Sequence, residues 1–172
     1  METRYPRHLP GFSYVGRHQY SLTFCTDYRH HAFTTDPPVA NAWSQIVRAS
    51  HEQHVDVLAY CFMPDHVHLV AGGAREDADC LEFIRKAKQY SGFYHNQRFG
   101  RRLWQQYGFE HVIRDDERLD RVIRYVLDNP VRAGLVNCVQ DYAYWGSGVW
   151  TREELLDFAC LGRSWGRGSR SG

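Results

Sequence analysis

The chain has 172 residues, of which 43% are hydrophobic, and its formal net charge is +1 at pH 7. This length suits one domain with a continuous core, and no stretch approaches the ~20 apolar residues that a membrane-spanning helix needs. A charge so close to zero excludes a general attraction to polyanions, so any affinity for nucleic acid must come from local basic clusters.

The cysteines and the first residues indicate a reducing environment. The five cysteines are scattered along the chain and never form a Cys-x-x-Cys pair. This spacing argues against both a disulfide framework and a structural zinc site. The opening residues lack the apolar segment of an export signal, so we expect a cytoplasmic protein.

The first third of the chain predicts an arm, a strand and a helix. Residues 1–17 are rich in arginine, proline, glycine and aromatic side chains and show no period, which is typical of an extended arm. The arm is either a loose terminus or a segment whose arginines contact phosphates. Alternation of apolar and polar residues then predicts a strand over residues 18–26 with one buried face. Asp36, followed by two prolines, favours a helix that extends to about residue 51.

The rest of the chain predicts three more strands and three more helices. Residues 55–63 and 66–71 are apolar strand-like runs, joined by a turn at Pro64 and Asp65. Residues 79–98 have helical spacing with a basic side, and residues 109–114 alternate as a fourth strand. The last long helix ends at residues 127–129, before Pro130. A short helix follows over residues 152–160, and residues 162–172 are too poor in apolar side chains to pack.

The order of these elements is strand, helix, strand, strand, helix, strand and then an extra helix. It predicts an α+β fold of the ferredoxin-like, split β-α-β type. We expect an antiparallel sheet with helices on one face and an extra C-terminal helix that bears a tyrosine. Because no repeat or linker divides the sequence, we expect a single domain over residues 1–172, with the arm at 1–17, a catalytic core at 18–136 and a flexible tail at 162–172.

Two histidines in the third predicted strand are candidate metal ligands. His66 and His68 are two residues apart, and a strand places alternate side chains on the same face. Neutral imidazoles bind divalent metals, and two of them leave coordination positions open for a substrate. The pattern His-x-His is also common by chance, and strand histidines satisfied by hydrogen bonds are its simpler interpretation.

A tyrosine and an asparagine in the last long helix extend this candidate site. Tyr125 and Asn129 are four residues apart, about one helical turn, at the edge of the apolar stripe. A tyrosine hydroxyl that attacks a phosphodiester forms a covalent phosphotyrosine. An amide oxygen and two imidazoles are a mixed donor set suited to Mg²⁺ or Mn²⁺. Taken alone, Tyr125 is a packing residue and Asn129 a helix end.

The segments around these residues resemble a known family. The sequence MPDHVHLV at residues 63–70 looks like the HUH motif (histidine, bulky hydrophobic residue, histidine) of one-tyrosine transposases of single-stranded DNA. The sequence YVLDNPVRAGLV at residues 125–136 looks like their tyrosine helix. LWQQ at residues 103–106 and HVIR at 111–114 match the branch of REP-associated tyrosine transposases. The motifs are specific in this order and spacing, and the resemblance covers about residues 16–144.

The resemblance implies a metal-dependent endonuclease and strand transferase that cuts single-stranded DNA next to hairpins, in DNA transposition or REP-element processing. It implies that Tyr125 is the nucleophile of a 5′-phosphotyrosine intermediate and that His66, His68 and Asn129 hold Mg²⁺ or Mn²⁺. The implied partner is single-stranded DNA with a hairpin, bound by a monomer or a homodimer without any membrane. Further candidates for contacts to DNA flank the site or lie in the arm: Arg4, Arg7, Arg17, His111 and Arg114.

The sequence departs from the family pattern at one position. Asp65 stands where the family often carries asparagine, so its carboxylate either repels phosphate or tunes a histidine.

Two other functional interpretations stay open. An inactive descendant would bind DNA or RNA hairpins by stacking on aromatic side chains. A zinc hydrolase ranks last, because no carboxylate base is evident near the histidines. The aromatic candidates for stacking are Tyr14, Tyr28, Trp104 and Trp145.

Overall fold

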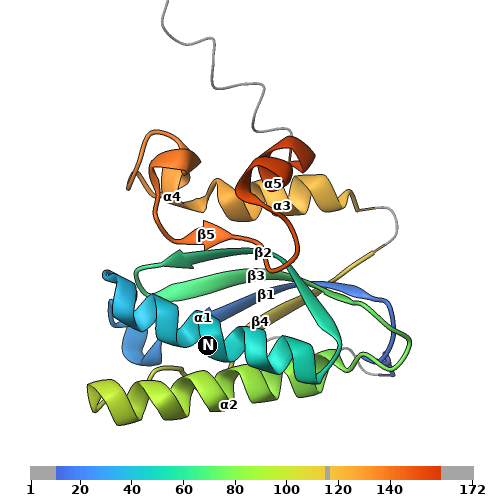
Figure 1. Cartoon of the computed structure of the whole chain (residues 1–172), viewed down its shortest axis with the longest axis horizontal. Helices are drawn as coiled ribbons and strands as arrows, with labels where there is room; N and C mark the ends of the chain where they lie inside the picture. Colours follow the sequence, from blue (N-terminus) through green and yellow to red (C-terminus); the bar gives the residue numbers. More distant parts are fainter. Residues whose placement is uncertain (1–10, 115–116, 160–172) are drawn as a thin grey trace, which may run out of the picture.

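One antiparallel sheet lies between two helical layers in the computed structural model, which describes residues 11–114 and 117–159 (Figure 1). Arg4, Arg7 and the predicted tail at 162–172 lie outside the described residues. The strands are β1 (Gln19–Cys25), β2 (Val55–Met63), β3 (His66–Gly73), β4 (Phe109–Ile113) and β5 (Trp145–Gly146). The helices are α1 (Asp36–Glu52), α2 (Cys80–Phe99), α3 (Leu119–Leu127), α4 (Asn129–Arg132) and α5 (Arg152–Phe158), with short 3-10 turns η1 (Asp27–Arg29) and η2 (Val139–Asp141).

The sheet confirms the predicted α+β class and adds a strand. Its order is β4-β1-β3-β2-β5, and every neighbouring pair is antiparallel. The first six strands and helices follow the predicted sequence of elements within a few residues. The two-residue strand β5 was not predicted, because a segment this short carries no alternation. It pairs with the middle of β2 and closes that edge of the sheet.

The alternation of β3 divides its side chains between the two layers. Leu69 and Ala71 belong to the buried cluster that includes α1 and α2, so we call this side the α1–α2 face. Val70 belongs to the cluster that includes α3 and α5, so we call the other side the α3 face. His66 and His68 are in phase with Val70. Both imidazoles therefore leave the sheet on the α3 face.

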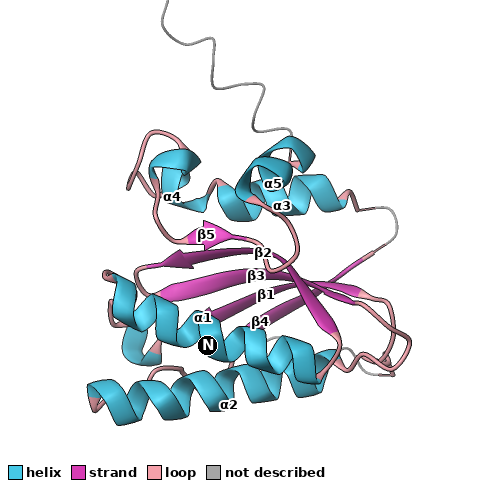
Figure 2. Ribbon diagram, in the orientation of Figure 1, coloured by secondary structure: helices cyan, strands magenta, loops and turns pink. Residues whose placement is uncertain are grey.

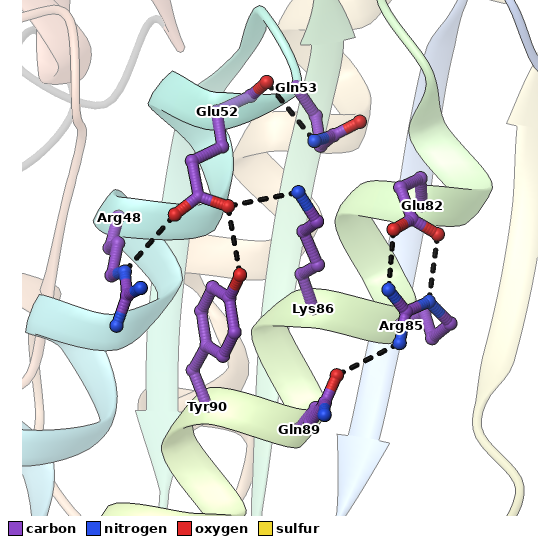
Figure 3. Close-up of polar contacts among 8 residues, drawn as sticks. All are labelled: Arg48, Glu52, Gln53, Glu82, Arg85, Lys86, Gln89 and Tyr90. Atoms are coloured by element: carbon purple, nitrogen blue, oxygen red, sulfur yellow. Dashed lines mark hydrogen bonds and ion pairs between the residues drawn. The ribbon is translucent and has the colours of Figure 1, made fainter.

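The α1–α2 face is closed by apolar residues and by a polar network between the two helices. Ile46 of α1 and Phe83 of α2 are fully buried against the sheet. At the outer side of the helix pair, the Glu52 carboxylate accepts hydrogen bonds from Arg48, Lys86 and Tyr90 at 3.1, 2.9 and 2.9 Å (Figure 3). One carboxylate therefore joins α1 to α2.

The two long helices α1 and α2 share one face, as the split β-α-β prediction has it, and the extra tyrosine-bearing helix, for which no face was predicted, packs on the opposite one. Figure 2 shows α3 and α5 on the side of the sheet that α1 and α2 leave open. Ile123, Val126 and Leu127 of α3 are buried there. The physical reason is that β2 is apolar on both sides, with Cys61 and Phe62 both fully buried, so each side needs a cover.

The described part of the predicted arm is packed rather than loose. Tyr14 is buried and stacks on Tyr20, with ring centroids 5.7 Å apart. The amide of Gly16 donates to the carbonyl of Ala78, just before α2. Residues 11–17 therefore belong to the folded unit. In the part of the chain that the structure describes, no helix has the length and apolar character needed to cross a bilayer.

Candidate active site

The two histidines of β3 face each other. Their Nε2 atoms lie 3.0 Å apart, and their ring planes are nearly perpendicular at 89°, with centroids 4.7 Å apart. The alternation of the strand brings the rings to one face, and the close approach of the two nitrogens makes them a pair. Two nitrogen atoms directed at one point form the start of a metal site.

Each imidazole is held at its other nitrogen. His66 Nδ1 lies 2.6 Å from Asp65 Oδ1, and because an ionised carboxylate only accepts, the imidazole donates. His68 Nδ1 lies 2.9 Å from Thr23 Oγ1 on the neighbouring strand β1. Arg29 in turn pairs with Asp65 through a 2.9 Å contact between Nε and Oδ2. Such outer contacts orient the rings of metal-binding histidines.

The surroundings keep both imidazoles neutral at pH 7. Burial lowers the pKa of His68 to about 4, and repulsion from a protonated His66 and from the charges of Arg29 and Arg132 acts in the same direction. Burial also lowers the pKa of His66, although Asp65 opposes this shift. Burial disfavours the ionised form of Asp65, but the hydrogen bond from His66 and the charge of Arg29 outweigh it, so the Asp65 pKa lies below its usual value. A neutral imidazole keeps the lone pair that a metal needs.

The donor atoms fit an octahedral divalent ion. Two adjacent ligands at about 2.1 Å from such an ion are about 3.0 Å apart, which equals the Nε2 separation found here. With Asp65 holding the proton of His66 at Nδ1, the His66 Nε2 carries a lone pair. When Thr23 accepts from His68 Nδ1, the second Nε2 carries one too, and a cation can bind both; in the other tautomer, His68 Nε2 donates to His66 Nε2 and the pair is satisfied without a cation. The residues present therefore fit Mg²⁺ or Mn²⁺.

Carboxylate and cysteine side chains of the described residues do not complete a metal site around His66 and His68. Among residues 11–114 and 117–159, no group of three or more histidine, cysteine, aspartate and glutamate side chains could hold a metal. Cys61 lies opposite His68 in the sheet, but burial raises the pKa of its thiol to about 12. It is a neutral thiol, so it is a poor ligand. A third protein ligand would have to be an oxygen such as the Asn129 amide.

The helix α3 places Tyr125 at the surface of the same layer. The Tyr125 side chain is 55% exposed, whereas Val126 and Leu127 beside it are buried against β2 and β3. Its ring lies under the guanidinium of Arg132, 4.3 Å from the centroid. Tyr125 is therefore not a core residue. Within the described residues, no hydrogen bond or ring contact joins it to either histidine.

Asn129 is the first residue of α4, just after α3 ends, and keeps its side-chain oxygen open. The amide nitrogen donates to the carbonyls of Tyr125 and Val126 at 3.0 and 3.2 Å. These bonds satisfy two carbonyls at the end of α3, as an ordinary helix-ending residue does. They also fix the amide plane while none of the hydrogen bonds found in the described residues uses Oδ1. Both roles expected for Asn129 are thus compatible with one conformation.

Three further residues support the site and were not assigned from the sequence. Arg132 contacts the Tyr125 ring, and its charge helps to lower the pKa of His68, so it lies between the two halves of the site. Thr23 and Arg29 hold His68 and Asp65. Arg132 lies within the tyrosine-helix motif, so its position in the sequence could have indicated a role in the site. Thr23 could not, because only the pairing of β1 with β3 brings it opposite His68.

The other predicted DNA contacts lie apart from the histidines. Arg17 pairs with Glu76 at 2.8 Å. Both residues lie near the C-terminal end of β3, whereas His66 lies at its N-terminal end. His111 is on the α3 face but on the edge strand β4, where it contacts Glu117 at 2.9 Å. Arg114 follows the end of β4. None of the three joins the histidine pair.

Three of the four aromatic residues expected to stack on nucleic acid are buried, which corrects that expectation. Tyr14, Trp104 and Trp145 are exposed by 4, 5 and 1% because they fill the two cores on either side of the sheet. Tyr28 differs, since 91% of its side chain is exposed.

The sequence matches a known protein family and, over part of its length, a curated relative. The family model described as "Transposase IS200 like" matches residues 14–129. A Haemophilus influenzae protein assigned as a REP-associated tyrosine transposase is 32% identical over an alignment 100 residues long, which covers 52% of this chain and 57% of that relative. The match thus spans little more than half of the length of that protein.

Two solved structures share the fold. One is a REP-associated tyrosine transposase bound to a REP hairpin, with a TM-score of 0.65 at 22% identity over 84% of this chain and 82% of that one. The other is a Deinococcus radiodurans protein described as a transposase, with a TM-score of 0.50 at 20% identity over 74% of this chain and 92% of that one. At these identities the likeness concerns the α+β architecture.

Proposed function

The chain belongs to the family of IS200-like transposases, and on that premise we propose that it is a metal-dependent endonuclease and strand transferase of single-stranded DNA. The proposed substrate is a strand with a hairpin beside the cleaved bond, the ligand named for the solved relative. The proposed unit is one domain, a monomer or a homodimer, whose first six elements form the ferredoxin-like split β-α-β core.

One observation carries the proposal. The Nε2 atoms of His66 and His68 converge at 3.0 Å on the sheet face against which α3 packs, and α3 exposes Tyr125 instead of burying it. A tyrosine that only packed would be turned into the core with Val126. The positions of a candidate metal and of a candidate nucleophile on one layer support a phosphoryl transfer.

The proposed reaction exchanges one phosphodiester for another. The Tyr125 hydroxyl attacks the phosphorus, the bond from phosphorus to the 3′-oxygen breaks, and the phenolic proton ends on the released 3′-hydroxyl. The product is a 5′-phosphotyrosine, which keeps the energy of the ester bond. Attack by a 3′-hydroxyl of another strand end then releases Tyr125 and rejoins DNA, so no external energy source is needed.

The protein groups have separate tasks in this scheme. Arg132 lies over the Tyr125 ring, where its charge attracts the phosphate toward the nucleophile. His66, His68 and Asn129 would hold the divalent ion, which when bound withdraws charge from the phosphate oxygens. Thr23 and Asp65 keep the two imidazoles oriented.

The test is covalent capture of DNA. The full-length protein is incubated with Mn²⁺ and a labelled pool of DNA hairpins with randomised single-stranded flanks, and the adduct is resolved on a denaturing gel. We expect an adduct with the wild type and with Tyr94→Phe, a matched control on α2, and none with Tyr125→Phe. Equal products from Tyr125→Phe would refute the nucleophile. Binding that persists in EDTA without an adduct under any metal would favour the inactive hairpin-binding module.

A further inference from the structure

The loop that follows β1 carries the most exposed large apolar side chain among the described residues. Tyr28 lies in the 3-10 turn η1, and 91% of its side chain is exposed. Its ring makes no core contact that would explain an aromatic residue there. Exposure on this scale is a cost in water, because an aromatic ring gains stability by burial.

The backbone of this loop is strained at two successive residues. Tyr28 has φ 50° and ψ 26°, and Arg29 has φ 55°. Residues other than glycine rarely adopt this left-handed region, and a residue held there is strained. Strain of this kind persists only where the surroundings impose it, and it gathers at binding and catalytic sites.

Hydrogen bonds hold the strained loop against the turn that precedes the histidines. The Thr26 amide donates to the carbonyl of Asp65 at 2.9 Å, and the amide of Asp27 donates to the carbonyl of Leu103 at 2.8 Å. The fully buried Thr26 hydroxyl lies 2.7 and 2.9 Å from the carbonyls of His30 and Asp65. The loop is thus fixed to the rest of the protein by hydrogen bonds at several positions.

Two polar contacts connect the loop to the candidate active site. Arg29, the residue after Tyr28, pairs with Asp65 at 2.9 Å, and Asp65 contacts His66 at 2.6 Å. Arg29 also lies 2.7 Å from the sulfur of Cys25, which pairs with His66 across the sheet. Tyr28 is therefore one residue from a side chain that lies at the edge of the histidine pair.

We propose that Tyr28 is a base-stacking residue that positions the single-stranded DNA next to the cleaved phosphate. The inference rests on the proposed function, and it names the part of the substrate that this loop receives. A nucleobase fits because every base offers a flat face, and stacking on an exposed aromatic ring tolerates any sequence. Of the two neighbouring residues Tyr28 and Arg29, Arg29 is already paired with Asp65, so Tyr28 is the side chain that can contact a base.

The test separates a ligand role from a structural role. Tyr28→Asn removes the ring but suits the left-handed backbone, since asparagine is enriched there, and Tyr28→Phe keeps the ring. The probe is a DNA hairpin with a single-stranded 5′ flank that carries 2-aminopurine at successive positions, titrated in EDTA with the full-length protein. We expect wild type and Tyr28→Phe to quench the fluorescence of one flank position. We expect Tyr28→Asn to lose that quenching and to bind about tenfold more weakly, with an unfolding temperature no lower than that of the wild type.

The outcomes distinguish this inference from the proposed function. Unchanged quenching and affinity in Tyr28→Asn would overturn the stacking role even when the wild type forms a covalent adduct with Mn²⁺. A lower unfolding temperature in Tyr28→Asn with unchanged binding would assign Tyr28 to the fold and overturn the inference as well. Loss of quenching in Tyr28→Asn by a protein that forms no adduct would support the stacking role and leave the endonuclease refuted. Tyr94→Ala on α2 is the matched exposed aromatic, and it should change neither readout.

Discussion

The two faces of the sheet differ in how their polar groups are used. On the α1–α2 side, the Glu52 carboxylate accepts three hydrogen bonds from within the protein, donated by Arg48, Lys86 and Tyr90 (Figure 3). On the α3 face, the Nε2 atoms of His66 and His68 have only each other. The Glu52 carboxylate is thus satisfied by protein groups, whereas the histidine pair keeps nitrogen atoms that a ligand can use.

The comparison is sharpest within β3, where neighbouring side chains belong to different faces. Leu69 is fully buried with α1 and α2, and His68 before it belongs to the site. A strand that is covered on both sides can therefore stabilise the fold with one set of alternate residues and present ligands with the other. Substitutions at successive positions should separate stability from metal binding.

The largest effect is expected at this pair. His68→Ala removes one of two imidazole ligands, so Mn²⁺ binding measured by titration calorimetry should weaken at least about a hundredfold. Its free energy of unfolding should change by only about 1–2 kcal/mol, since the lost polar contacts are those to Thr23 and His66.

Leu69→Ala is the counterpart on the α1–α2 face. It should lower the free energy of unfolding by about 2–5 kcal/mol, the cost of a cavity at a fully buried leucine. The folded fraction should bind Mn²⁺ as the wild type does. If Leu69→Ala lost metal affinity, or His68→Ala lost most of the stability, the division of the strand between the faces would be wrong.

An intermediate effect is expected for Asp65→Asn, which places the residue often carried by the family at this position. The change removes the carboxylate that accepts from His66, so Mn²⁺ affinity should fall about tenfold. It also removes a negative charge next to the proposed phosphate position, so DNA affinity in EDTA should be equal or higher. Calorimetry and fluorescence anisotropy would measure the two changes. Parallel losses in both would contradict a role in tuning the histidine.

The smallest effect is expected on the α1–α2 face at Glu52. Hydrogen bonds from Lys86, Tyr90 and Arg48 lower the pKa of this carboxyl from 4.5 to about 2. A carboxyl with a lowered pKa in the folded state contributes stability above its unfolded pKa, and this contribution disappears as the pH falls from 4.5 toward 2. Glu52→Gln should therefore show a flatter decline of the urea midpoint over that pH range. Identical pH profiles would show that the network contributes nothing.

Much of this protein follows from local periodicity. Alternation located β1 and β4, and apolar runs joined by a turn located β2 and β3. The two-residue spacing placed His66 and His68 on one face, and a four-residue spacing placed Tyr125 and Asn129 one turn apart. These features depend only on the geometry of a single strand or helix. The order of elements predicted the α+β class in the same way.

Tertiary structure decided what touches what. The pairing of β1 with β3 brings Thr23 to His68, and a strained loop brings Arg29 to Asp65. The second helical layer, strand β5 and the burial of Trp104 and Trp145 escaped prediction for the same reason. Each depends on contacts between residues far apart in the chain, and such contacts follow from how whole faces are buried and not from the period of any one segment.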